Sequence, residues 1–154
     1  MNREEALTLI REHVKNDFLV KHMIAVEAVM RALAKKFNEN EEQWALAGLL
    51  HDMDWEETQN TPEQHSIKAQ VYLEAAGIDP VIRKAIHVHN HMHGLEPETP
   101  LEKALYSAEE LTGLIVACAL VQPDKKLASV KAESVLKKFK SLSFAKGVNR
   151  DIII

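Results

Sequence analysis

The chain has a single cysteine, Cys118, among its 154 residues. This excludes both a disulfide framework and a thiol-rich metal site. No run approaches the roughly 18 consecutive apolar residues that a membrane span needs. The first residues also lack the apolar stretch of a secretory signal peptide. We therefore expect a cytoplasmic protein without a membrane partner.

The chain also has no excess of positive charge. The net charge is −4 at pH 7, which provides no electrostatic reason to expect duplex nucleic acid as the main partner. Hydrophobic residues make up 46% of the chain and charged residues 27%, the ordinary composition of a globular protein. There are no internal repeats, low-complexity tracts or linkers. A chain of this length can bury one sizeable core, so we predict a single compact domain over residues 1–154.

Alternation typical of strands is almost absent, whereas helix start signals recur. Asn2 with Glu5 forms a capping-box pattern, and Asp79-Pro80 and Thr99-Pro100 each place a proline after a cap residue. We expect helices over about 2–14, 17–37, 41–51, 61–76, 79–90, 99–120 and 125–140, a short one near 143, and a loop over 52–60. The sequence predicts an all-α bundle of about seven helices.

The chain ends on three consecutive isoleucines, Ile152 to Ile154. Exposed ends are usually polar. We expect either that these residues pack on the body of the protein or on a partner, or that a longer parent chain was cut here.

The eight histidines are the unusual feature of the composition. Helical phase separates those expected to point inward from those expected to face solvent. Four histidines from four predicted helices fall on apolar faces: His22, His51, His65 and His89. His87 and His91 lie on the opposite face and are expected to be exposed. Among the acids, Glu109 sits at the edge of an apolar stripe, and Glu110 points away from it.

Each of these features alone is unremarkable, because a histidine on an apolar face is usually a hydrogen-bonded core residue. Several inward-facing histidines and acids in one core would destabilise the fold, since each buried ionisable group without a partner costs several kcal/mol. A divalent cation removes that cost by binding imidazoles and carboxylates together. Mixed ligands of this kind suit iron, manganese, zinc, cobalt or nickel, as one ion or two.

The same residues resemble the HD superfamily of metal-dependent phosphohydrolases, over nearly the whole chain. The resemblance rests on four segments that look like a bacterial and archaeal HDIG-type subgroup: Lys21-His22, Leu49-Leu50-His51-Asp52, Ala85-Ile86 with His89-Asn90, and the string from Tyr106 to Gly113. It implies a helical HD-domain bundle that holds a divalent metal.

The resemblance also implies roles for individual residues. His22, His51 and Asp52 match the first ligands of the primary metal, and His65 and His89 match histidines that hold a second metal or contact phosphate, with Asp52 bridging. The last ligand is normally the aspartate of an Ala-Asp-Glu-Leu-Thr-Gly string, where this chain has Glu109. Glutamate moves the carboxylate by roughly a bond length, so the site adapts its rotamer, binds through water or loses affinity.

The leading hypothesis is hydrolysis of a phosphoester or phosphoanhydride in a small, nucleotide-like molecule, with Asp52 as the catalytic metal ligand. Arg83 and Lys103 are candidate substrate contacts, whereas Lys84 is expected on a solvated face. Asp54 and Glu56 fit either acid–base groups or an ordinary acidic loop.

Two other functions stay open. The glutamate at the last ligand position favours a metal-stabilised nucleotide-binding or regulatory module with little turnover. A di-iron oxygenase-type HD protein would need both His65 and His89 at the metals. The basic segment 125–140 fits an amphipathic helix, with a role in binding RNA or an anionic ligand as the alternative. A homodimer is also left open.

Overall fold

The computed structural model describes all of residues 1–154 and contains helices but no strand, which confirms the all-α prediction. The α-helices are α1 (Arg3–His13), α2 (Asp17–Phe37), α3 (Glu41–Leu50), α4 (Trp55–Thr58), α5 (Ile67–Ala75), α6 (Pro80–His89), α7 (Pro100–Leu120), α8 (Ala132–Phe139) and α9 (Arg150–Ile153), with 3-10 turns η1 (Pro62–Gln64), η2 (His91–His93) and η3 (Leu127–Ser129). None of these helices is long and apolar enough to cross a membrane. Contacts divide the chain into two compact units, Met1–Tyr106 and Ser107–Ile154.

Local signals set several helix ends as predicted. The capping box at Asn2 and Glu5 is present, with both reciprocal hydrogen bonds, and it starts α1. Asp79 caps α6 by accepting a hydrogen bond from the backbone N–H of Val81. Gly77, with φ of +68°, follows α5 in the left-handed conformation that glycine adopts without strain.

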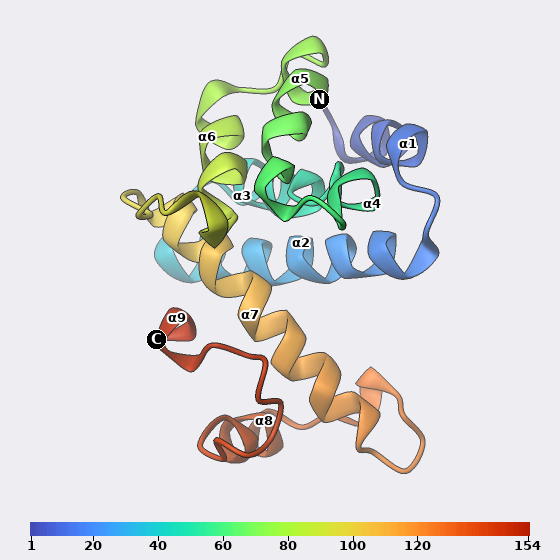
Figure 1. Cartoon of the computed structure of the whole chain (residues 1–154). Helices are drawn as coiled ribbons and strands as arrows, with labels where there is room; N and C mark the ends of the chain where they lie inside the picture. Colours follow the sequence, from blue (N-terminus) through green and yellow to red (C-terminus); the bar gives the residue numbers. More distant parts are fainter. The chain divides into compact units, whose positions relative to one another are not determined.

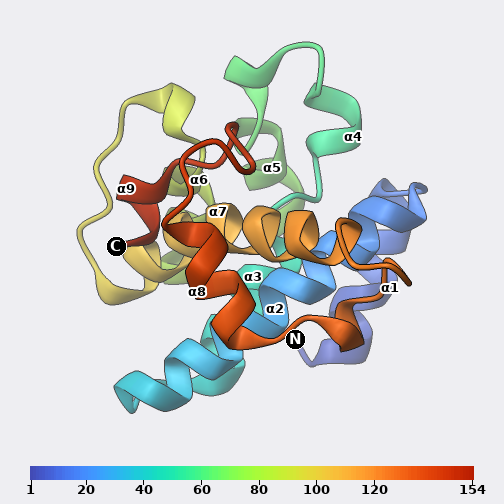
Figure 2. The same ribbon diagram turned by 90° about the horizontal axis from the view of Figure 1, so that it is seen from below.

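The core of the first unit forms where α2 packs against α3 (Figures 1 and 2). α2 buries Val20, Met23, Val26, Glu27, Met30 and Ala34. Phe18, in the first turn of the same helix, is 81% exposed. Gly48 of α3 sits so close to α2 that an added Cβ would lie 3.0 Å from the backbone nitrogen of Glu27. Because Gly48 has no side chain, α2 and α3 can pack closely at this position.

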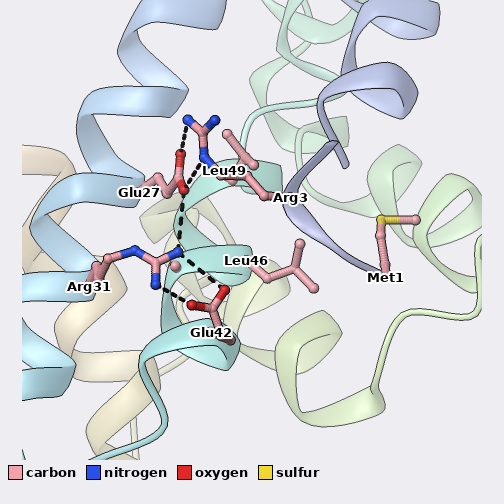
Figure 3. A pocket seen from close by; sticks show the side chains of 8 residues that line it. Met1, Arg3, Glu27, Arg31, Glu42, Leu46 and Leu49 are labelled. Atoms are coloured by element: carbon pink, nitrogen blue, oxygen red, sulfur yellow. Dashed lines mark hydrogen bonds and ion pairs between the residues drawn. The ribbon is translucent and has the colours of Figure 1, made fainter. Parts of the chain in front are cut away.

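A chain of ion pairs joins α1, α2 and α3 beside a small pocket (Figure 3). The buried carboxylate of Glu27 accepts two hydrogen bonds from the guanidinium of Arg3, at 2.7 and 2.9 Å. Arg31 lies 3.7 Å from the same carboxylate and also pairs with the exposed Glu42. Because Glu27 has two cationic neighbours, its charge is compensated inside the unit.

The segment after the third helix differs from the prediction. Residues 52–60 were expected to be a loop, yet they contain the single turn α4. The helix expected to start at Thr61 begins only at Ile67, because Ser66 has φ of +65° and interrupts the helical path after η1. This kink places His65 outside α5, although the residue is buried as predicted.

α5 and α6 then run side by side, and α6 also contacts α3 (Figure 1). Gln70 of α5 joins the pair by donating a hydrogen bond to the carbonyl of Arg83, at 3.1 Å. The C-terminal end of α6 is therefore carried to the same region as the end of α3.

The second unit contains most of α7 and the chain that follows it. The basic helix expected over 125–140 is shorter, because η3 precedes α8 and α8 covers only Ala132–Phe139. The last helix forms at Arg150–Ile153 rather than near 143. The hydroxyl of Ser107 donates to the carbonyl of Ile152 at 2.7 Å, which ties α9 to α7; the final Ile154 is exposed.

Candidate metal centre

Asp52 lies just after α3 and is surrounded by imidazole nitrogens. Its Oδ2 is 3.7 Å from Nε2 of His22 and 3.5 Å from Nε2 of His51. Its Oδ1 is 3.2 Å from Nε2 of His65 and 3.9 Å from Nε2 of His89. The two oxygens of one buried carboxylate therefore divide four histidines into two pairs.

Three of these rings are oriented by hydrogen bonds at their other nitrogen. Nδ1 of His51 donates to the carbonyl of Gly48 at 2.8 Å, and Nδ1 of His89 donates to the carbonyl of Ile86. Nδ1 of His65 donates to Asp54 Oδ1 at 2.8 Å. Because a carbonyl or carboxylate oxygen only accepts, each Nδ1 carries a proton, and Nε2 is the ring nitrogen that faces Asp52 and is left to bind a metal.

The donor sets fit divalent metal ions. His22, His51 and Asp52 form one group and Asp52, His65 and His89 form another, and within each group the ligand atoms lie within 4.8 Å of one another. Ligand atoms about 2.1 Å from a shared ion in tetrahedral geometry lie roughly 3.4 Å apart. The 3.1 Å between Nε2 of His65 and Nε2 of His89 is close to that separation. A cation held by both nitrogens would therefore fit the spacing that the structure already has.

Asp54 was weighed in the sequence as an acid–base group or part of an acidic loop, and the structure gives it a different place. Its side chain is fully buried. Besides contacting His65, it accepts a hydrogen bond from the backbone N–H of Ala69 at 2.9 Å. Burial lowers the pKa of His65, but its hydrogen bonds to Asp52 and Asp54 and the charges of both carboxylates outweigh burial and raise that pKa to about 9. Asp54 therefore orients and polarises His65.

Glu56, the other acid of that segment, forms hydrogen bonds with the backbone between α1 and α2. Its carboxylate accepts hydrogen bonds from the N–H groups of Lys15 and Asn16. Its role is to tie the chain between α1 and α2 to α4.

The two acids that the sequence singled out near the last ligand position lie in α7. Glu109 is partly buried and lies in α7, within the second unit. Glu110 was expected to be solvated, but it is partly buried and accepts a hydrogen bond from the N–H of Asn149.

The candidate substrate contacts are cationic residues of the first unit. Arg83 pairs with Glu74 at 3.2 Å, an interaction between α6 and α5. Lys103 is exposed on α7. Lys84 is exposed as expected, and it pairs with Glu98 and Glu102.

The histidines that were not predicted to bind metal differ in their exposure and contacts. His91 is exposed, as predicted. The prediction was wrong for His87, which is partly buried and stacks on His93 with ring centroids 4.8 Å apart. His93 lies beyond the end of α6, and its Nε2 is 2.9 Å from the carbonyl of His65. The signal that could have revealed this contact is the short spacing of His87, His89 and His93 around the end of α6.

The comparisons with known proteins agree with this donor set. The family model of the HD domain matches residues 19–140, well over half of the chain and a range that includes every histidine of the cluster. An all-helical protein with this buried histidine–aspartate cluster is of the class that can hold divalent metals. The chain belongs to the HD domain family, which generally includes metal-dependent phosphohydrolases. No curated protein and no solved structure gives a match.

Proposed function

We propose that the protein is a metal-dependent phosphohydrolase that acts on a phosphoester or phosphoanhydride of a small, nucleotide-like molecule. The observation that carries the proposal is the position of Asp52, whose two oxygens each face a pair of histidine Nε2 atoms. A carboxylate in this position suits a bridge between two metal ions, as in two-metal centres that act on phosphates.

In this proposal His22, His51 and Asp52 bind one metal, and Asp52, His65 and His89 bind the other. Glu109 has the place of the last acidic residue in the family's string, and its role as a metal ligand stays a prediction of that resemblance. Iron, manganese, zinc, cobalt and nickel all accept this mixture of imidazole and carboxylate.

Divalent metal at this site would lower the pKa of a coordinated water and polarise a phosphoryl oxygen. The chain's own residues prepare the site for that chemistry. Gly48, Ile86 and Asp54 hold three imidazoles in the tautomer that leaves Nε2 able to bind metal. The ring of Trp55 packs edge-on against His65, with centroids 4.9 Å apart, and shields that imidazole from water.

Positive charge for the substrate's phosphates would come from Lys103, which is exposed, and from Arg83. Arg83 is paired with Glu74, so it would have to exchange that partner in order to bind a phosphate.

The test is phosphate release by the full chain loaded with Mn²⁺ or Fe²⁺, from p-nitrophenyl phosphate and from a panel of nucleoside phosphates. We expect turnover that falls at least about 100-fold in Asp52→Ala, because both metals lose their shared ligand. His91→Ala is the matched control, since His91 is exposed close to His89 in the chain, and it should retain full activity. Tight nucleotide binding without phosphate release would instead support the regulatory module.

The group formed by Asp52, His65 and His89 also favours a second candidate, an oxidative di-iron enzyme, because that chemistry needs histidines at both metals. Dioxygen consumption by the iron-loaded protein, with no phosphate release from any substrate of the panel, would support this candidate over hydrolysis.

A further inference from the structure

The kink at His65 and Ser66 is held by side chains from the far end of α6 and from η2. Ser66 adopts φ of +65° and ψ of −15°, the left-handed conformation, which costs free energy for any residue other than glycine. Its hydroxyl donates to the carbonyl of His87 at 3.1 Å. A non-glycine residue stays in this conformation only where surrounding contacts impose it.

Asn90 supplies two of those contacts. Its Oδ1 accepts a hydrogen bond from the N–H of Met92, which defines the orientation of the amide. The amide nitrogen Nδ2 therefore points the other way and donates to the carbonyls of Pro62, at 2.9 Å, and His65, at 3.0 Å. Asn90 is itself buried. It holds the backbone at the first residue of η1 and just after its last residue in place.

His93 supplies the next contact. Its Nε2 lies 2.9 Å from the carbonyl of His65 and 3.0 Å from Oγ of Ser66. Because the carbonyl accepts only, Nε2 carries a proton and donates it. The stacked ring of His87 fixes the plane of His93. The carbonyl of His65 thus receives donors from two side chains that do not belong to its own segment.

We infer that Asn90 and His93 are positioning residues that hold the His65–Ser66 kink and so set the His65 imidazole for the second metal. Neither side chain is assigned to a metal; each acts through the backbone of His65. The inference rests on the proposed two-metal function. Without these donors Ser66 would relax towards ordinary backbone angles, and Nε2 of His65 would turn away from Asp52.

The test compares His93→Phe with His93→Gln in the full chain. Phenylalanine keeps a ring to stack on His87 but has no donor, whereas the glutamine amide nitrogen can replace Nε2. Co²⁺ is titrated into metal-free protein, and the bound metal is counted by elemental analysis and followed by its visible absorption. We expect His93→Phe to weaken the second Co²⁺ about 10–100-fold while the first stays within about threefold. His93→Gln should bind both ions like the wild type.

A further variant separates positioning from simple loss of structure. Glycine adopts φ of +65° without strain, so Ser66→Gly in the His93→Phe background should recover much of the lost affinity. This double variant carries the measurement if His93→Phe alone does not fold. Unchanged affinity in His93→Phe, or equal weakening of both ions, would overturn the inference. So would failure of the double variant to recover affinity. A wild-type chain that binds no second Co²⁺ would overturn the two-metal proposal itself.

Discussion

Asp54 shows how a single buried carboxylate can set the chemistry of a neighbouring ligand. It accepts the Nδ1 proton of His65 and the N–H of Ala69, so it connects the candidate metal centre to the first turn of α5. Carboxylates that hold a metal-binding imidazole in this way raise its basicity and fix its orientation. Asp54 therefore belongs to the metal centre although it contacts no predicted metal position.

Asp54→Asn tests this role with almost no change in size. Asparagine lacks the negative charge and has only one acceptor oxygen for two donors, so His65 loses orientation or basicity. We expect the second metal to bind about 10–100-fold more weakly, measured by titration of metal-free protein.

Asp79→Asn is the matched control, because asparagine caps helices as well as aspartate does. It should leave metal binding unchanged. Equal affinity in Asp54→Asn and the wild type would show that His65 needs no carboxylate behind it.

The packing of α2 on α3 decides where two of the ligands lie. Gly48 lets these helices approach, since a Cβ at this position would be 2.9 Å from Cγ of Met30 and 3.0 Å from backbone of α2. α2 carries His22, and His51 follows the last turn of α3. The separation of the two helices therefore also sets the separation of these two imidazoles.

Gly48→Ala should push α2 and α3 apart, because backbone atoms cannot move aside as a flexible side chain can. We expect the free energy of unfolding to fall by about 1–3 kcal/mol and the first metal to bind more weakly. Chemical denaturation and metal titration measure the two effects.

Gly113→Ala is the control on α7, where the nearest side-chain atom to an added Cβ is 3.7 Å away, an ordinary contact. Alanine has the higher helix propensity, so this variant should gain up to about 1 kcal/mol. A stabilised Gly48→Ala would mean that the helix contact is loose.

Metal binding should stabilise the molecule as a whole, because the histidine and aspartate donors come from distant parts of the first unit. They lie on α2, after α3, in the turn before α5 and at the end of α6. An unfolded chain does not hold these side chains together. A metal therefore binds the folded state and shifts the unfolding equilibrium towards it.

At a free metal concentration 100 times the dissociation constant, the gain is about 2.7 kcal/mol per site. For a chain of this size we expect the Tm to rise by about 5–10 °C with Mn²⁺, measured by calorimetry, and to return on chelation. His91→Ala should show the same rise and Asp52→Ala little or none. An equal rise in Asp52→Ala would place the metal elsewhere.

The amino-acid sequence by itself determined the helical class and most of the histidine cluster. His22, His51 and His89 could be selected because position on a helix face follows from spacing along the chain, which is local geometry. The caps at Asn2 and Asp79 were predictable for the same reason, since a cap involves residues two or three positions apart. Helical spacing indicates nothing about residues beyond the end of a helix, and the predictions were weaker for those residues.

Only the tertiary structure decided how the cluster is assembled. His65 was selected by the phase of a helix that does not reach it, and its burial comes instead from the kink at Ser66. The division of four imidazoles between the two oxygens of Asp52, the carboxylate behind His65 and the contact of His93 with the His65 carbonyl all join residues far apart in the chain. Such contacts depend on how helices pack and where turns reverse. Side-chain spacing along the sequence carries no direct record of either.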